Sequence, residues 1–174
     1  MQFDASAIRK LFEELETHLT LDESPSVIVI TGGALLALRG LRSATTDVEA
    51  VSNLSSIIRI AATSVARSRD LDPSWLNNRA QAFVPATFDV ATCEPEIVRG
   101  RLVVLGVSMT DLFLMKLNAA RDRDLEDLEL LWPHSGFESP QRAVDAYYAA
   151  YPDESFDPFL EAFVGMIASR AEHR

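Results

Sequence analysis

Two carboxylates spaced two residues apart, Asp47 and Glu49, give the sequence its clearest chemical signal. Side chains at this spacing on a strand point to the same face. Neighbouring carboxylates repel each other, and a divalent cation such as Mg²⁺, which prefers oxygen ligands, removes that repulsion. A solvated strand edge is the alternative, but Val48 and Val51 indicate a partly buried strand, where carboxylates without a partner are costly. We therefore predict that Asp47 and Glu49 bind metal.

A glycine pair, Gly32 and Gly33, precedes these carboxylates and is separated from Asp47 by thirteen residues. It follows residues 26–31, a β-branched apolar run typical of a strand buried on both faces. Where such a strand passes into a helix, backbone N–H groups and the helix dipole favour an anion, and glycine lets a phosphate approach closely. A plain tight turn is the alternative. At this distance from the two acids, the pair predicts a site for a nucleoside triphosphate and its metal ions.

Lysine is rare in this chain, with two lysines against fourteen arginines. Lys116 lies in residues 112–117, a segment that is apolar on nearly every side. Either its ammonium group reaches the surface along an apolar stem, or it is a point charge that binds the triphosphate. Asp124 and Asp127, three residues apart, share a helix face, and a solvated acidic face is the alternative for them.

A third carboxylate would complete a site for two metal ions. Asp89 has apolar neighbours and follows the break at Pro85, so we expect it on a strand over residues 87–92. Asp89 could equally begin the loop before residues 94–95. A protein with one metal ion, or an inactive one, is the alternative in that case.

Further candidate contacts come from two arginines and an aromatic segment. Arg39 and Arg42 flank the loop that leads to Asp47 and are candidates for contacts with phosphate or with an acceptor. Residues 75–78 (Trp-Leu-Asn-Asn) could stack against a base and hydrogen bond with it. Tryptophan at helical spacing is, however, more typical of a core.

The hydrophobic pattern predicts the elements that position these residues. We expect helices over residues 5–19, 33–39, 53–69 (capped by Asn53), 73 to before Pro85, 108–120 (opened by a capping box at Ser108) and 123–132. Two more helices should follow Ser139-Pro140 and Asp157-Pro158, in each of which a capping residue precedes proline. We expect strands over residues 26–31, 47–52, 87–92 and 101–107, with residues 94–100 as a hairpin connection. This order predicts an α+β fold with a small mixed sheet flanked by helices over residues 1–132. Residues 133–174 would form a C-terminal helical extension packed on the same domain.

Composition narrows the class of protein further. A chain of 174 residues fits one domain with a good core, and no apolar run reaches the roughly 18 residues that span a bilayer. The N-terminus lacks the pattern of a signal peptide, and the single cysteine, Cys93, cannot form an internal disulfide, so we expect a reducing cytoplasm. Three scattered histidines argue against a zinc site.

The charge of the chain is unevenly distributed. A net charge of −10 argues against a general nucleic-acid binder, which needs clustered cations. Residues 26–101, however, hold eight arginines against seven carboxylates, and the acidic excess lies toward the two ends. A selective contact between nucleic acid and the central segment therefore stays open.

The glycine pair and the two acids together resemble the signature of the DNA polymerase β-type nucleotidyltransferase superfamily. The thirteen-residue spacing is at the long end of that signature, and Glu49 stands where Asp is commoner. Residues 33–40, 75–77, 114–121 and 123–128 look like a family of small bacterial nucleotidyltransferase-like proteins. That family is related to the AbiEii-type toxins of abortive-infection and toxin–antitoxin systems.

The resemblance implies a minimal nucleotidyltransferase fold and the transfer of a nucleoside monophosphate from a nucleoside triphosphate to an acceptor hydroxyl. The acceptor would be RNA, such as the end of a transfer RNA, or a protein. Two Mg²⁺ ions would assist, with Mn²⁺ as a substitute, and Asp89 would complete the ligand set. Lys116 would bind phosphate and Asp127 would orient a group of the site.

The resemblance also implies a toxin restrained by a cognate antitoxin. The alternative is a non-catalytic module that keeps the fold and binds a nucleotide or a protein. No part of the sequence predicts a membrane partner.

Overall fold

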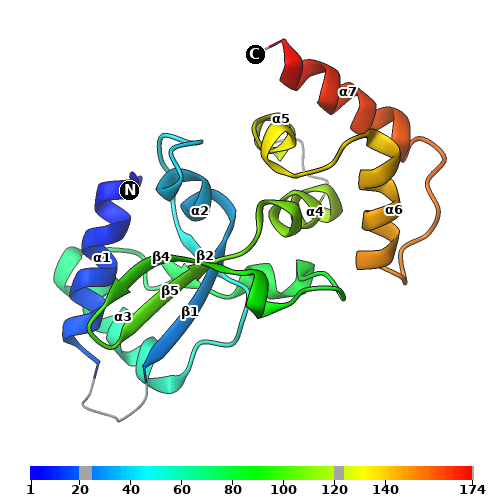
Figure 1. The fold of residues 1–174 in the computed structure, drawn as a ribbon. Helices are drawn as coiled ribbons and strands as arrows, with labels where there is room; N and C mark the ends of the chain where they lie inside the picture. The colour runs from blue at the N-terminus through cyan, green and yellow to red at the C-terminus, as the bar shows by residue number, and fades with distance from the viewer. Residues whose placement is uncertain (20–24, 120–123, 174) are drawn as a thin grey trace. The chain divides into compact units, whose positions relative to one another are not determined.

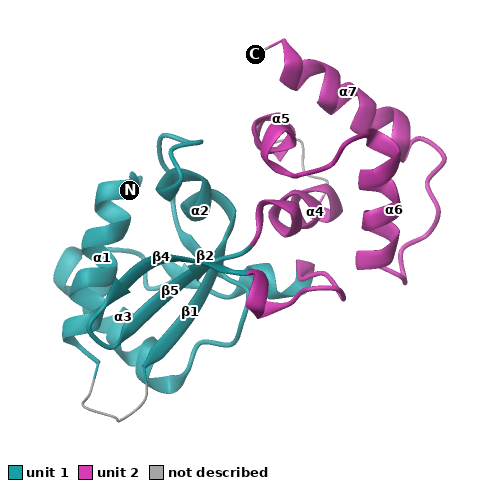
Figure 2. Cartoon of the chain, in the orientation of Figure 1, with its two compact units in different colours: residues 1–82, 93–107 teal, residues 83–92, 108–174 magenta. Residues whose placement is uncertain are grey.

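The computed structural model describes residues 1–19, 25–119 and 124–173 (Figure 1). The chain forms two compact units (Figure 2). Unit 1 comprises residues 1–82 and 93–107, and unit 2 comprises residues 83–92 and 108–174. The predicted mixed α+β fold is confirmed, because unit 1 holds a five-stranded mixed sheet and unit 2 holds helices. The division at residue 132 suggested by the sequence stays a prediction.

The sheet of unit 1 combines parallel and antiparallel neighbours in the order β3-β2-β1-β5-β4. Its strands are β1 (Ser26–Thr31), β2 (Val48–Ala50), β3 (Leu76–Asn77), β4 (Glu94–Arg99) and β5 (Leu102–Gly106). The central strand β1 pairs antiparallel with β2 and parallel with β5. Strand β3 runs parallel to β2, and β4 runs antiparallel to β5. The short strands β2 and β3 therefore form one edge of the sheet.

Three helices complete unit 1: α1 (Ala5–Thr17), α2 (Gly32–Leu38) and α3 (Ser56–Arg69). The apolar faces of α1 and α3 pack with the inward side chains of the sheet, such as Ile28, Ile30 and Val104, in one core. Burying this apolar surface supplies the main driving force for unit 1. The first helix begins where Asp4 accepts a hydrogen bond from the backbone N–H of Ala7 at 2.7 Å.

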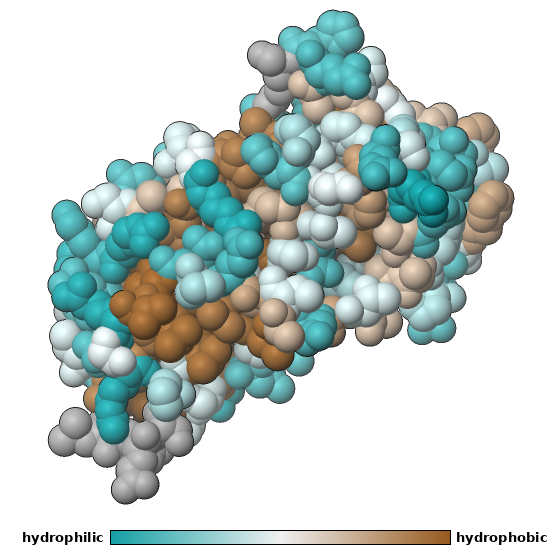
Figure 3. Space-filling model, viewed as in Figure 1, coloured by the Kyte–Doolittle hydropathy of each residue, from teal (hydrophilic) through white to brown (hydrophobic). Residues whose placement is uncertain are grey.

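The opposite face of the sheet carries apolar side chains that solvent reaches. Val27 and Val98 are 48% and 70% exposed, and both lie beside Val103 in the sheet. Figure 3 shows the resulting brown area over β1, β4 and β5. Because successive side chains of a strand point to opposite faces of the sheet, one face is buried under helices and the other carries exposed valines.

Unit 2 contains α4 (Met109–Ala119), α5 (Leu125–Leu131), α6 (Pro140–Ala150) and α7 (Leu160–Glu172). Phe113 lies at its centre, with its ring centroid 5.7 Å from those of Trp132 and Phe137. The Tyr151 hydroxyl donates a hydrogen bond to the Phe83 carbonyl oxygen at 2.7 Å, and burial raises the pKa of Tyr151. None of the helices in the described ranges is long and apolar enough to cross a membrane.

The predicted helix caps are partly confirmed. Ser108 and Ser139 cap α4 and α6, each accepting a hydrogen bond from the backbone N–H three residues later. Ser55, rather than Asn53, caps α3 in the same way. The helix predicted after Asp157 begins at Leu160, because Asp157 first forms a turn with the N–H of Phe159.

Three of the elements predicted for the segment between β2 and β5 in the sequence are wrong. Residues 76–77 form β3 instead of a helix, because they pair with β2. Residues 87–92 form a turn and a short 3₁₀ helix instead of a strand, and the Phe88 N–H donates to the Pro85 carbonyl oxygen. Residues 94–99 form β4 and not a connection, since pairing with β5 satisfies their backbone groups.

Candidate functional site

The pairing of β1 with β2 brings the glycine pair to the carboxylates. Thr31 lies opposite Glu49, and Gly32 is the next residue of the chain. A Cβ atom on Gly32 would lie 2.6 Å from Oε2 of Glu49, and Gly32 has a φ of +65°. The positive φ favours glycine here, and a side chain at this position would also displace the end of the Glu49 side chain. The predicted neighbourhood of Gly32 and Glu49 is therefore observed.

Gly33 lies against the loop that leads into β2. A Cβ atom on it would lie 2.7 Å from Oγ1 of Thr45 and 3.2 Å from Nη1 of Arg42. Thr45 is buried and exchanges two backbone hydrogen bonds with Phe3, and its hydroxyl donates to the Asp47 carbonyl oxygen at 3.2 Å. The guanidinium of Arg42 thus lies beside the glycine pair, where a phosphate contact was predicted.

Asp47 is held from the neighbouring strand by a residue to which the sequence assigned no such role. The side-chain amide of Asn77 donates to Oδ2 of Asp47 at 3.0 Å. Asn77 also lies opposite Glu49 in the parallel pairing of β2 and β3. The sequence suggested only a base contact for Asn77, because its segment was predicted to be helical. Only the strand pairing reveals its relation to Asp47.

We call Gly32, Gly33, Asp47 and Glu49 the glycine–carboxylate cluster. Its two carboxylates are half-buried. In the described part of the chain, no group of three or more His, Cys, Asp or Glu side chains is placed to hold a metal ion. Two carboxylates nevertheless fit Mg²⁺, which keeps several waters and takes phosphate oxygens as further ligands. The oxygen-only chemistry of the cluster suits such a hard cation.

Unit 2 contains a second charged group, which we call the lysine–carboxylate cluster. The ammonium nitrogen of Lys116 lies 2.8 Å from Oδ1 of Asp124 and 2.7 Å from Oδ2 of Asp127. These side chains are only 11%, 8% and 6% exposed. Lys116 therefore does not simply extend into solvent, and its predicted contact with phosphate stays a prediction. Arg123, part of the same sequence motif, lies outside the described residues.

Asp89 and Arg39 have other local partners. Asp89 belongs to unit 2, is exposed, and accepts a hydrogen bond from the N–H of Ala91 at 2.9 Å. Its place as a third metal ligand stays a prediction. Arg39 makes ion pairs with Glu94 and Glu96 at 2.9 and 2.8 Å, so its guanidinium is already engaged. Trp75, the aromatic residue suggested for stacking against a base, is a core residue whose indole N–H donates to the Ala62 carbonyl oxygen.

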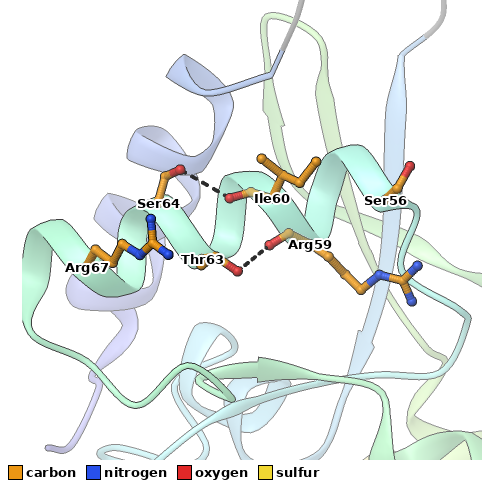
Figure 4. Close-up of a pocket in the computed structure, with 6 residues that line it drawn as sticks. All are labelled: Ser56, Arg59, Ile60, Thr63, Ser64 and Arg67. Atoms are coloured by element: carbon orange, nitrogen blue, oxygen red, sulfur yellow. Dashed lines mark hydrogen bonds between the residues drawn. The ribbon is translucent and has the colours of Figure 1, made fainter.

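The outer face of α3 forms a shallow hollow of about 390 Å³ (Figure 4). Arg59 and Arg67 lie on this face two turns apart, with the exposed Ile60 between them. The hydroxyls of Thr63 and Ser64 donate to backbone oxygens of the same helix, as the dashed lines show. The helix contains no carboxylate, so cationic groups dominate its outer face.

Comparison with known proteins identifies the family of this chain. The model of a family described as "Nucleotidyltransferase of unknown function (DUF6036)" matches residues 6–131. No curated protein and no solved structure matches the chain at the threshold of the search. The matched range includes both the glycine–carboxylate cluster and the lysine–carboxylate cluster.

We predict that Gly32→Ala destabilises the protein more than Gly40→Ala does. Both positions have positive φ, which costs an alanine about 1 kcal/mol, but no atom lies within 4 Å of a Cβ on Gly40. At Gly32 the displaced Glu49 carboxylate should add roughly 1 kcal/mol. Urea denaturation measures both variants. The additional loss of free energy of unfolding at Gly32 should disappear when Glu49 is also replaced by alanine. Equal losses for Gly32→Ala and Gly40→Ala would contradict the contact between Gly32 and Glu49.

We also predict that Lys116→Met lowers the free energy of unfolding by about 3 kcal/mol, because it removes the cation from two buried carboxylates. Lys10→Met is the matched control, since Lys10 is the other lysine and is exposed. Its effect should stay within about 0.5 kcal/mol. Similar effects of the two substitutions in denaturant melts would show that the lysine–carboxylate cluster does not stabilise unit 2.

Proposed function

We propose that this chain, which belongs to the matched nucleotidyltransferase family, moves a nucleoside monophosphate from a nucleoside triphosphate to an acceptor hydroxyl. The observation that carries the proposal is the contact between Gly32 and the Glu49 carboxylate. It unites a backbone turn that a phosphate can approach with acidic groups that suit a divalent cation. Asp47 lies two residues from Glu49 and supplies the second acid.

In the proposed reaction the acceptor oxygen attacks the α-phosphorus of the nucleotide. The bond from that phosphorus to the oxygen bridging to the β-phosphate breaks, pyrophosphate leaves, and the hydroxyl proton passes to solvent. Mg²⁺, or Mn²⁺ in its place, would be held by Asp47 and Glu49 and would supply positive charge at the triphosphate. Gly32, Gly33 and Arg42 would bind the phosphates. Such catalysis depends on position and charge and needs no nucleophilic side chain.

Lys116 is proposed to bind a phosphate group, with Asp127 as the residue that orients it. An ammonium group has three N–H donors, and two are directed at Asp124 and Asp127. The third can therefore donate to a phosphate oxygen while the two carboxylates fix the position of the nitrogen. This arrangement supports a role for Lys116 that goes beyond stabilising the helices.

RNA is the acceptor that the surface of unit 1 favours. Arg59 and Arg67 present two positive charges on the carboxylate-free face of α3, although the chain as a whole carries −10. Arginine pairs well with the phosphates of a nucleic-acid backbone. We propose that this face binds acceptor RNA, such as a transfer RNA. The resemblance to AbiEii-type toxins supports a toxin role for the transfer reaction.

A second candidate function is a non-catalytic module that binds a protein. Phe156, Phe159 and Phe163 are 77%, 75% and 37% exposed, and Phe156 stacks on Tyr148. Residues 143–169 around them contain five carboxylates and no lysine, arginine or histidine. Exposed aromatic groups among charges of one sign favour a protein partner with a basic rim, and a cognate antitoxin would fit that description.

Transfer of label from α-³²P-labelled nucleotides tests the first proposal. The protein is incubated with Mg²⁺, each of the four nucleotides in turn, and cell RNA or cell protein. We predict label in RNA and a loss of about 100-fold or more on Asp47→Ala, because a charge needed at the transferred group is removed. Asp153→Ala, an exposed acid of unit 2, is the control. Absence of transfer with every nucleotide would contradict the enzyme and favour the binding module.

Binding to a fluorescent transfer RNA tests the role of α3 separately. Arg59→Glu should weaken binding. It should also reduce the slope of log K against log salt by about the amount that one phosphate contact contributes. Arg142→Glu, an exposed arginine of unit 2, changes the net charge equally and should have a smaller effect. Equal weakening by both variants would show that total charge, and not the α3 face, governs RNA binding.

A further inference from the structure

Thr45 joins three segments of unit 1 beside the glycine–carboxylate cluster. Its two backbone groups pair with Phe3: the Phe3 N–H donates to the Thr45 carbonyl oxygen at 2.6 Å, and the Thr45 N–H donates to the Phe3 carbonyl oxygen at 2.9 Å. Phe3 is 4% exposed and belongs to the hydrophobic core of unit 1. The backbone of Thr45 is therefore anchored to the core through Phe3, although Thr45 lies in the loop that leads into β2.

The side chain of Thr45 packs against the start of α2. A Cβ atom on Gly33 would lie 2.7 Å from Oγ1 and 3.1 Å from Cβ of Thr45, so a side chain at residue 33 would force Thr45 to shift. Thr45 is buried, and its branched side chain is stiff about the bond from Cα to Cβ. The contact with Gly33 consequently fixes how closely the loop approaches the first turn of α2.

The hydroxyl of Thr45 holds the backbone of Asp47. It donates to the Asp47 carbonyl oxygen at 3.2 Å. The N–H of the same peptide group belongs to Val48 and donates to the Trp75 carbonyl oxygen at 2.6 Å. Both polar atoms of this peptide group are thus bonded, one to the loop and one to the segment that leads into β3. Because the peptide group is planar, these two bonds also fix the direction in which the Asp47 side chain leaves the backbone.

These contacts connect two parts of the cluster that are separated by thirteen residues in the chain. The side chain of Thr45 touches Gly33 and is also bonded to the backbone of Asp47. A triphosphate and its metal ion would extend from the glycine pair to the carboxylates, so the separation of these two parts has to suit that complex. Thr45 is the residue that fixes this separation.

We propose that Thr45 is a positioning residue that holds Asp47 in the place where its carboxylate binds the metal ion. The proposal rests on the proposed function, since it takes Asp47 as a metal ligand. It gives the loop between the glycine pair and the carboxylates a role of its own, which the sequence patterns did not indicate. It also explains why residue 33 is glycine, because the space beside its Cα atom is taken by Thr45.

Binding of Mn²⁺ alone, measured from the electron paramagnetic resonance signal of free Mn²⁺, tests the proposal without any transfer assay. Thr45→Val keeps the branched shape and loses the hydrogen bond to Asp47, so it should weaken Mn²⁺ binding about 5-fold, the equivalent of one net hydrogen bond. Thr45→Ser keeps the hydroxyl and should restore the affinity of the unaltered chain. Thr46→Val is the matched control, because Thr46 is the exposed neighbour, and it should leave the affinity unchanged.

The outcomes separate this inference from the proposed function. Unchanged Mn²⁺ affinity in Thr45→Val, or an equal loss in Thr45→Ser, would overturn the role of the hydroxyl while leaving the metal site in place. Binding that persists in Asp47→Asn would refute the metal site itself. Thermal melts verify that each variant is folded at the temperature of the titration. If Thr45→Val does not fold, Thr45→Ala replaces it, since alanine and serine at residue 45 differ only by the hydroxyl.

Discussion

The antiparallel register of β1 with β2 is the constraint on which the candidate site depends. It sets Thr31 opposite Glu49, so the chain leaves β1 through Gly32 at the place where the Glu49 carboxylate lies. A shift of one residue would turn both carboxylates to the other face of the sheet. The buried side chains of Ile30, Val48 and Ala50 oppose such a shift, because it would expose them. The hydrophobic core thus fixes the polar geometry.

Two kinds of charged group result from this fold. In unit 1 Asp47 and Glu49 are half-buried, and Asp47 accepts a hydrogen bond from the neutral side-chain amide of Asn77. In unit 2 the cation is already present, because Lys116 is enclosed with Asp124 and Asp127. The family match spans both clusters.

Sequence patterns were sufficient where the signal was local. The β-branched run of β1, the amphipathic α1, and the serine caps of α4 and α6 were predicted correctly, as was the neighbourhood of Gly32 and Glu49. The misassigned segments depend on distant partners. Strand β3 has only two residues and exists because it pairs with β2, so its composition gives no strand signal. Asn77 was assigned no contact with Asp47 for the same reason.

The proposed function requires that Asp47 and Glu49 hold a divalent cation at the glycine pair. A crystal grown with Mn²⁺ and a non-hydrolysable nucleoside triphosphate analogue tests it most directly through anomalous scattering. We predict an anomalous peak about 2.1 Å from carboxylate oxygens of both residues, with the triphosphate against Gly32 and Gly33. A nucleotide bound elsewhere, or a peak that contacts neither carboxylate, would contradict it.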